Sequence, residues 1–269
     1  MWGGSGEIDR KLQVTGLDVW VWSSPADDVA GGDLYFVSMC GCAEVSRLFV
    51  ADVSGHDAEA AGLAERLRKL MRRHINKPDQ TRLAQALNQD FDRISGHGKF
   101  ATAVLATFYP PSRHLMILNA GHPRPLCYNA RTRGWVPLDP EAPVAIESVR
   151  NLPLGITAEG QFRQFAVQMQ PGDLILIYTD GITESQDQAG KMLGEKGLID
   201  LLSTVNPERP EDLIPAIQQK MRSASSDELG LDDRTVMVLQ ANGQEPPQQG
   251  LGERFRVMAK MLGLIGDSH

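Results

Sequence analysis

The segment Arg47–His56 reads Arg-Leu-Phe-Val-Ala-Asp-Val-Ser-Gly-His, an apolar strand that runs directly into an aspartate, Asp52. A second apolar run, Leu174–Tyr178, leads in the same way into Thr179-Asp180-Gly181. A carboxylate at the rim of a buried strand is costly unless something pairs with it. These two strand ends are therefore the features from which both the fold and the function are predicted.

The rest of the chain alternates strand and helix signals. Apolar residues at steps of three and four predict two helices after the Asp52 strand, separated at Pro78-Asp79, and a second pair over about Gly194–Ser203 and Pro210–Ser223. Strands in hairpin-like runs with helices in pairs indicate an α+β fold rather than regular βαβ repetition. The predicted strands are Leu17–Trp22, Leu34–Met39, Arg47–Asp52, Ala101–Phe108, His114–Asn119, Asp173–Tyr178 and Thr235–Leu239.

Composition excludes several classes of protein. The chain has 269 residues, with 27 Lys and Arg against 34 Asp and Glu, which gives a net charge of −7. An acidic chain is a poor general binder of nucleic acid or anionic membranes, because both attract clustered Lys and Arg. No apolar run approaches the roughly 20 residues of a transmembrane segment. Three cysteines cannot form a disulfide framework, so we expect a reducing compartment and a cytoplasmic location.

The domain organisation is predicted from a change in composition near residue 240. Residues 1–240 read as one domain, and 241–250 (ANGQEPPQQG) read as a linker. Residues 251–269 carry apolar side chains at spacings of four and three, which predicts an amphipathic C-terminal helix. That helix either docks on its own domain or frays, or it docks a partner or a membrane surface.

Two more groups of aspartates extend the pattern. Asp33 follows Gly31-Gly32 and precedes a strand, and Asp232-Asp233 precede the strand Thr235–Leu239. Any one of these is explained as an ordinary turn residue. As a converging set they would repel one another, and no run of Lys or Arg adjoins them in sequence. A hard divalent cation such as Mg²⁺ or Mn²⁺ would neutralise that charge, since both prefer oxygen ligands.

The same residues carry a family resemblance that covers about Leu17 to Gln240. Six blocks in this order resemble the metal-dependent protein serine/threonine phosphatases related to protein phosphatase 2C, in the bacterial branch that includes SpoIIE and RsbU. The blocks are Asp28-Val29-Ala30-Gly31-Gly32-Asp33-Leu34-Tyr35, Ala51-Asp52-Val53-Ser54-Gly55-His56, Leu118-Asn119-Ala120-Gly121-His122-Pro123, Leu152-Pro153-Leu154-Gly155, Tyr178-Thr179-Asp180-Gly181-Ile182-Thr183-Glu184 and Asp232-Asp233-Arg234-Thr235.

The resemblance implies a four-layer α-β-β-α sandwich of two antiparallel sheets flanked by helix pairs. It also implies a site with two Mn²⁺ or Mg²⁺ ions. Asp52 would bridge the ions, the backbone carbonyl of Val53 would add a ligand, and Asp180 and Asp232 would hold one ion. Asp33 would coordinate directly or through water.

The implied reaction is hydrolysis of phosphoserine or phosphothreonine in a phosphoprotein, by in-line attack of a metal-bridging hydroxide. The leaving group would take its proton from metal-bound water or from His56. The usual substrate in this branch is an anti-sigma factor antagonist, in partner-switching signalling. The alternative is a catalytically silent phosphoprotein-binding or scaffolding module of the same fold.

Three residues stand apart from these assignments. The family usually has an acidic residue where this chain has Phe36, and a glycine where it has Asp57. An acidic residue at position 57 suits the first turn of the helix that it would open. His122 is interpreted either as a structural turn residue or as a hydrogen-bonding group near the site.

Overall fold

The computed structural model describes residues 1–26, 31–39, 45–55, 57–77, 79–96, 98–138, 151–187, 189–224 and 232–244. Its helices are α1 (Ala58–His74), α2 (Gln80–Ser95), α3 (Asp180–Thr183), α4 (Gly194–Leu202) and α5 (Leu213–Ala224), with a 3₁₀ turn at Pro210–Asp212. Its strands are β1 (Trp2–Gly4), β2 (Ile8–Val14), β3 (Leu17–Ser24), β4 (Asp33–Met39), β5 (Ser46–Val53), β6 (Ala101–Tyr109), β7 (His114–Ala120), β8 (Leu126–Asn129), β9 (Gly134–Pro137), β10 (Phe165–Gln168), β11 (Leu174–Tyr178) and β12 (Arg234–Ala241).

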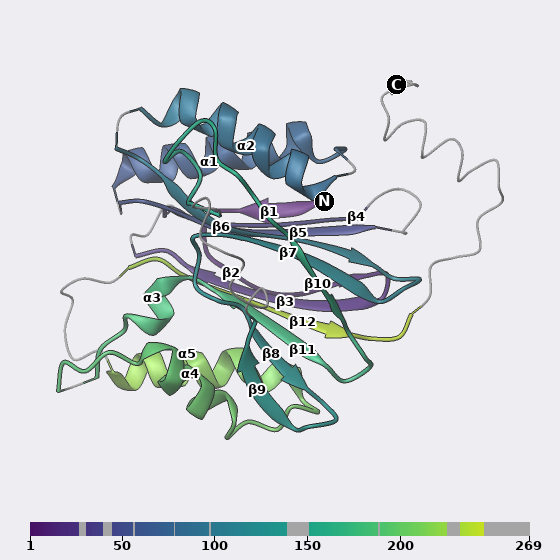
Figure 1. Cartoon of the computed structure of the whole chain (residues 1–269). Coiled ribbons are helices and arrows are strands. Elements are labelled where there is room, and N and C mark those ends of the chain that lie inside the picture. The colour runs from purple at the N-terminus through teal and green to yellow at the C-terminus, as the bar shows by residue number, and fades with distance from the viewer. Residues whose placement is uncertain are drawn as a thin grey trace, which may run out of the picture.

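The strands form two six-stranded sheets that stack face to face between layers of helices (Figure 1). One sheet has the order β1-β4-β5-β6-β7-β10, and the other has the order β2-β3-β12-β11-β8-β9. All pairs of neighbouring strands are antiparallel. Helices α1 and α2 cover the first sheet, and α3, α4 and α5 lie against the second. The predicted α+β sandwich of two antiparallel sheets with flanking helices is confirmed.

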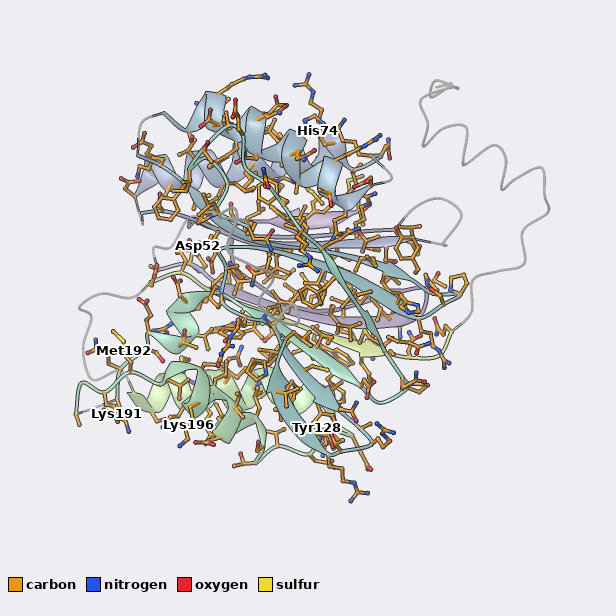
Figure 2. The ribbon with its side chains drawn as sticks, viewed as in Figure 1. Asp52, His74, Tyr128, Lys191, Met192 and Lys196 are labelled. Atoms are coloured by element: carbon orange, nitrogen blue, oxygen red, sulfur yellow. The ribbon has the colours of Figure 1, made fainter. Side chains whose placement is uncertain are left out.

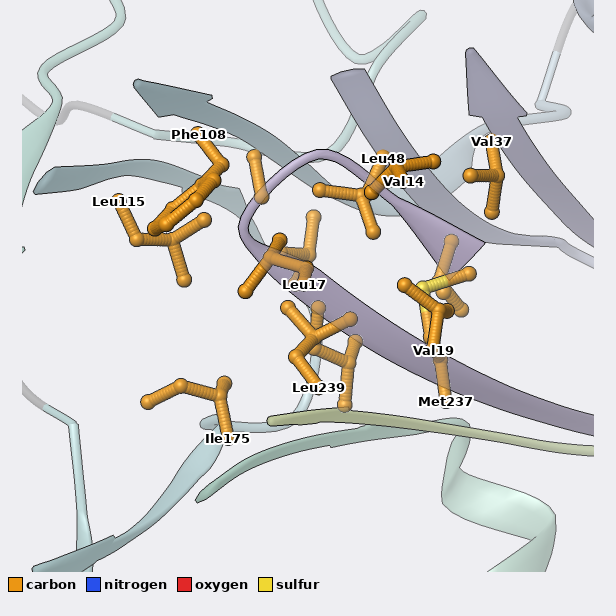
Figure 3. Packing of buried hydrophobic residues seen from close by; sticks show 14 of the residues in the cluster. Val14, Leu17, Val19, Val37, Leu48, Phe108, Leu115, Ile175, Met237 and Leu239 are labelled. Atoms are coloured by element: carbon orange, nitrogen blue, oxygen red, sulfur yellow. The ribbon is translucent and has the colours of Figure 1, made fainter. Parts of the chain in front are cut away.

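Three hydrophobic clusters hold these layers together. The first fills the space between the sheets, where alternate residues of most strands point inward, as Figure 3 shows for Val19, Leu48 and Leu239. The second lies between the first sheet and the helices α1 and α2. The third lies between the second sheet and the helices α4 and α5. Successive residues of a strand therefore pack into different clusters, and this fixes which face of the sheet each side chain occupies.

Two different local features explain the two departures from the family pattern: strand alternation at Phe36 and helix capping at Asp57. Phe36 is 1% exposed and packs in the cluster beneath α1 and α2, three residues along β4 from Asp33 and so on the opposite face of the sheet. An aromatic side chain suits that apolar layer. Asp57 is the N-cap of α1, and its carboxylate accepts a hydrogen bond from the backbone N–H of Ala60 at 2.9 Å.

Helix α2 begins as its sequence indicates. The Asp79 side chain accepts a hydrogen bond from the backbone N–H of Arg82, so it caps the helix directly after position 78. The connection at Ser112-Arg113 joins β6 to β7 in a hairpin, with Tyr109 paired to His114. Both local signals are confirmed.

The C-terminal boundary differs slightly from its prediction. Strand β12 runs to Ala241, which pairs with Leu17, so the sheet extends one residue into the predicted linker. Residues 245–250 and the predicted tail helix at 251–269 lie outside the described residues. Within the part of the chain that the structure describes, no helix is long and apolar enough to cross a membrane.

Candidate metal centre

The predicted carboxylates gather at one end of the sandwich, where strands of both sheets begin or end. Asp33 opens β4 and Asp52 lies one residue before the end of β5, and the antiparallel register places their Cα atoms opposite each other. Figure 2 shows Asp52 at the side of the sandwich where α3 lies. The first sheet therefore contributes two neighbouring carboxylates to this end of the molecule.

The second sheet contributes the other acids. Strands β11 and β12 pair with Tyr178 opposite Val236, and the backbone N–H of Thr179 continues the ladder to the carbonyl of Thr235 at 3.0 Å. Asp180 lies two residues beyond the end of β11, after Thr179, and Asp232 and Asp233 precede β12. The chain thus brings residues that are about 50 positions apart in sequence to the same sheet end.

The electrostatics of Asp52 show that these acids act on one another. Burial and the negative charges of Asp180, Asp232, Asp233 and Glu184, in that order of importance, together raise the pKa of the Asp52 carboxyl to about 7. The groups that act most strongly on Asp52 after burial are all carboxylates. A cation placed among them would reverse this repulsion.

Asp180 and Asp33 are perturbed in the same direction. Burial raises the pKa of Asp180, and Asp232 and Glu184 add to the shift. Asp33 is 2% exposed, and burial together with the charge of Asp52 holds its pKa well above the usual range, against the opposing influence of the Thr179 and Thr235 hydroxyls, of which Thr179 donates a hydrogen bond to Oδ2. Keeping such groups ionised at neutral pH requires a positive partner.

Asp232 and Asp233 differ in their surroundings. Asp232 is exposed, so it is open to solvent and to an approaching substrate. Asp233 is 4% exposed, and its carboxylate accepts hydrogen bonds from the backbone N–H groups of Ala26 at 2.8 Å and Gly32 at 2.5 Å. Asp233 therefore links Ala26 to Gly32, the residue before Asp33, while the exposed Asp232 accepts one hydrogen bond at Oδ1, from the backbone N–H of Asp233 at 2.8 Å.

Glycines keep the backbone close to these groups. An added Cβ at Gly32 would lie 2.6 Å from the carbonyl oxygen of Val53, and an added Cβ at Gly31 would overlap the Asp233 carboxylate. Only glycine fits where the backbone approaches other groups so closely. The Val53 carbonyl, predicted as a ligand, thus has a neighbour without a side chain.

The family model for "Stage II sporulation protein E (SpoIIE)" matches residues 44–242, about three quarters of the chain. The chain belongs to the SpoIIE family. Among curated proteins, this SpoIIE-family chain is 22% identical to the phosphoserine phosphatase RsbU of Bacillus subtilis (strain 168) over 231 residues. The alignment covers 84% of the chain but 64% of RsbU, so the chain spans a little under two thirds of the length of that relative.

Solved structures share the fold. The RsbU and RsbW domains of the Mycobacterium tuberculosis protein Rv1364c match with a TM-score of 0.72 and 24% identity, over 93% of this chain and 69% of that one. The catalytic domain of the serine/threonine protein phosphatase PstP, solved with two manganese ions, matches with a TM-score of 0.56 and 13% identity. That match covers 83% of this chain and 97% of PstP.

A Mn²⁺ or Mg²⁺ site fits the residues of this SpoIIE-family chain in chemistry. All the donors are oxygens, and the buried Oδ1 atom of Asp33 has no hydrogen-bond partner. Within the described residues, however, no three His, Cys, Asp or Glu side chains are close enough to form a ready ligand set. Ions that usually keep several waters do not require a ready set of three side-chain ligands. The donor set therefore fits Mn²⁺ or Mg²⁺, with water and the Val53 carbonyl completing it.

Of the two histidines considered from the sequence, the structure describes only His122. His56 lies outside the described residues, so its role as a proton donor stays a prediction. His122 is 5% exposed, and its Nδ1 atom lies 2.8 Å from the hydroxyl of Thr102, the residue paired with Asp52 across β5 and β6. Burial lowers the pKa of His122 to about 3, so the ring is neutral and serves as a structural link near the site.

Two residues near the centre are absent from the predicted site. Glu184 follows Asp180 by four positions, one turn of helix, and its charge raises the pKa of both Asp52 and Asp180. That spacing is the signal from which it could be found. Thr179 donates a hydrogen bond to Asp33 at 2.7 Å from the other sheet. No local sequence pattern reveals such a contact across 146 residues.

Proposed function

We propose that this SpoIIE-family chain is a metal-dependent phosphoprotein phosphatase that hydrolyses phosphoserine or phosphothreonine. The observation that carries the proposal is the gathering of Asp33 and Asp52 from one sheet with Asp180 from the other at one end of the sandwich, where burial and neighbouring carboxylates raise the pKa of each. A protein that gathers mutually repelling acids at an accessible sheet end incurs a cost in stability. A bound divalent cation offsets that cost and gives the cluster a catalytic use.

In the proposed site Asp52, Asp180, Asp232, Asp33 and the Val53 carbonyl hold two Mn²⁺ or Mg²⁺ ions. When bound, such ions supply Lewis-acid chemistry, polarising phosphoryl oxygens and lowering the pKa of water, so that hydrolysis needs no covalent phosphoenzyme. Asp52 holds the centre of the site, Asp233 holds Gly32 beside Asp33, and the exposed Asp232 leaves the phosphoryl group of a protein substrate room to approach.

We propose a phosphoserine-bearing signalling protein as the substrate class. The support is the phosphoserine phosphatase name of the curated relative RsbU and the resemblance to the SpoIIE and RsbU branch, whose usual substrate is an anti-sigma factor antagonist. Cys127, the cysteine among the described residues, does not suit a cysteine-phosphatase nucleophile, because its free thiol is buried and its pKa is raised to about 11.

A second candidate function is a silent phosphoprotein-binding module of the same fold. One observation favours it, namely that no ready three-residue ligand cluster forms within the described residues. Such a module would bind a phosphorylated partner and leave its phosphate in place. The two candidates differ in turnover and in the need for a metal.

Release of phosphate from a phosphoserine peptide, or hydrolysis of p-nitrophenyl phosphate, separates them. We expect Mn²⁺ to support turnover and chelation to remove it. Asp180→Asn should lower kcat/KM by about tenfold or more, because it weakens one of two ion sites and leaves Asp52 intact. Turnover that is unchanged by chelator, or equal in the Asp180→Asn variant, would refute the proposal of a metal-dependent phosphatase. Absence of turnover with retained binding of a phosphopeptide would support the silent module.

A further inference from the structure

A series of buried hydrogen bonds leads from the second sheet to the first near the predicted ligands. It runs from the hydroxyl of Ser23 on β3 to that of Thr235 on β12, from the backbone N–H of Thr235 to the hydroxyl of Thr179 just after β11, and from that hydroxyl to Asp33 of the opposite sheet. The Ser23 and Thr235 hydroxyl oxygens are 2.9 Å apart, and all three side chains are at most 1% exposed. Polar groups buried this deeply in a core are retained at a cost, so their arrangement calls for an explanation.

The hydrogen-bond pattern fixes the direction of the Thr179 hydroxyl. Its oxygen accepts a hydrogen bond from the backbone N–H of Thr235 at 2.9 Å, and its single proton is donated to Oδ2 of Asp33 at 2.7 Å. A hydroxyl has one proton to give, so this one is committed to the carboxylate. The geometry leaves Oδ1 of Asp33 buried without a partner.

Thr179 also stands next to Asp180 in the chain, as the N-cap residue of α3. One residue therefore connects a predicted ligand of the first sheet by a hydrogen bond and a predicted ligand of the second sheet by a peptide bond. Carboxylates that bind metals are oriented by such outer hydrogen bonds, and their loss commonly reduces metal affinity 10–100-fold.

We propose that Thr179 is a positioning residue that holds Oδ2 of Asp33 and thereby directs the free Oδ1 to the metal centre, so that metal affinity depends on the contact between the two sheets. The inference rests on the proposed function, since it assumes that a divalent cation binds among these carboxylates. It extends the proposed function by assigning a ligand's orientation to a residue that does not itself bind metal.

The test compares Mn²⁺ binding by calorimetry in four forms of the full chain. Thr179→Val keeps the shape of the side chain but removes both the donor to Asp33 and the acceptor for the Thr235 N–H, and Thr179→Ser restores the hydroxyl. Thr107→Val is the matched control. Thr107 is also buried and donates to Gln80 of α2, and it lies near the end of β6 that is farther from Asp52. Thermal unfolding in chelator reports the stability of each metal-free form, and Thr179→Ala replaces the valine variant if that one does not fold.

We expect Thr179→Val to bind Mn²⁺ about tenfold more weakly or worse, and to raise the Mn²⁺ concentration needed for half-maximal activity more than it lowers kcat. Thr179→Ser and Thr107→Val should bind like the wild type. Unchanged affinity in Thr179→Val, or an equal loss in Thr107→Val, would overturn the inference while leaving the proposed function in place. A wild type that binds no Mn²⁺ would overturn the proposed function and the inference together.

Discussion

Replacing Asp52 by asparagine should abolish phosphatase activity and at the same time stabilise the metal-free protein. We expect kcat/KM to fall by about 10³-fold or more, which corresponds to roughly 4 kcal/mol of transition-state stabilisation. Asp52 has the central place in the proposed site, because four carboxylates raise its pKa. Asparagine keeps the shape of the side chain and removes the charge that would hold the ions.

The gain in stability follows from the raised pKa. In the folded, metal-free protein the pKa of Asp52 is about 7, above the ordinary value of roughly 3.9 for an unfolded chain. The folded state therefore binds the proton more tightly, and stability is lost as pH rises through about 7. Asparagine is neutral at every pH, so Asp52→Asn should be the more stable form at about pH 8, and its advantage should shrink as pH falls below about 7 and vanish near about pH 4.

Thermal unfolding in chelator across this pH range measures the effect, and added Mn²⁺ should stabilise the wild type but not Asp52→Asn. Asp173→Asn is the matched control. Asp173 is 5% exposed and accepts backbone hydrogen bonds from Ala130 and Gln170 away from the site, so its replacement should destabilise the protein and spare catalysis. An Asp52→Asn variant that is destabilised at about pH 8, or that keeps its activity, would contradict the proposed role of Asp52.

Replacing Gly181 by alanine should move Asp180 away from Asp232 and Asp233, the two groups of acids that the second sheet contributes to the site. Gly181 is buried in α3, directly after Asp180, and an added Cβ would overlap the backbone carbonyl oxygen of Asp233. Backbone cannot yield as a flexible side chain does, so α3 must move away from the start of β12. We expect a loss of about 1–3 kcal/mol in unfolding free energy and about 10²-fold in kcat/KM, because misplaced reacting groups are costly.

Gly62→Ala supplies the control for that experiment. Gly62 lies in α1 with no atom within 4 Å of an added Cβ, so alanine should stabilise the protein by about 0.5–1 kcal/mol through the backbone entropy alone. Urea unfolding and phosphate release measured on both variants decide the matter. The close contact between Gly181 and Asp233 would have no functional meaning if Gly181→Ala matched Gly62→Ala in both assays.

The sequence predicted the centre of the fold better than its margins. Strands with continuous apolar runs, such as β5 and β11, are buried on both faces, so hydrophobicity alone identifies them. Strands β1, β2, β9 and β10 lie at the edges of the two sheets, and β2 exposes most of its residues. Little apolar surface is buried at an edge, so the periodic signal there is weak.

The site shows the same division between local and long-range information. Asp52 and Asp180 were recognisable because each ends an apolar strand, and the resemblance supplied their predicted roles. The different roles of Asp232 and Asp233 depend on which carboxylate accepts hydrogen bonds from the backbone N–H groups of Ala26 and Gly32, more than 200 residues away. The Thr179–Asp33 contact likewise exists only once the sheets are stacked, so no pattern within either strand contains it.

Crystals of the full chain grown with Mn²⁺, measured on both sides of the manganese absorption edge, test the central claim most directly. We expect anomalous density within coordinating reach of the Asp52 carboxylate, shared with Asp180 and Asp232 and approached by Oδ1 of Asp33. Density at these positions would establish the carboxylate cluster as a metal centre. A Mn²⁺-saturated crystal with no anomalous density beside Asp52 would contradict the claim.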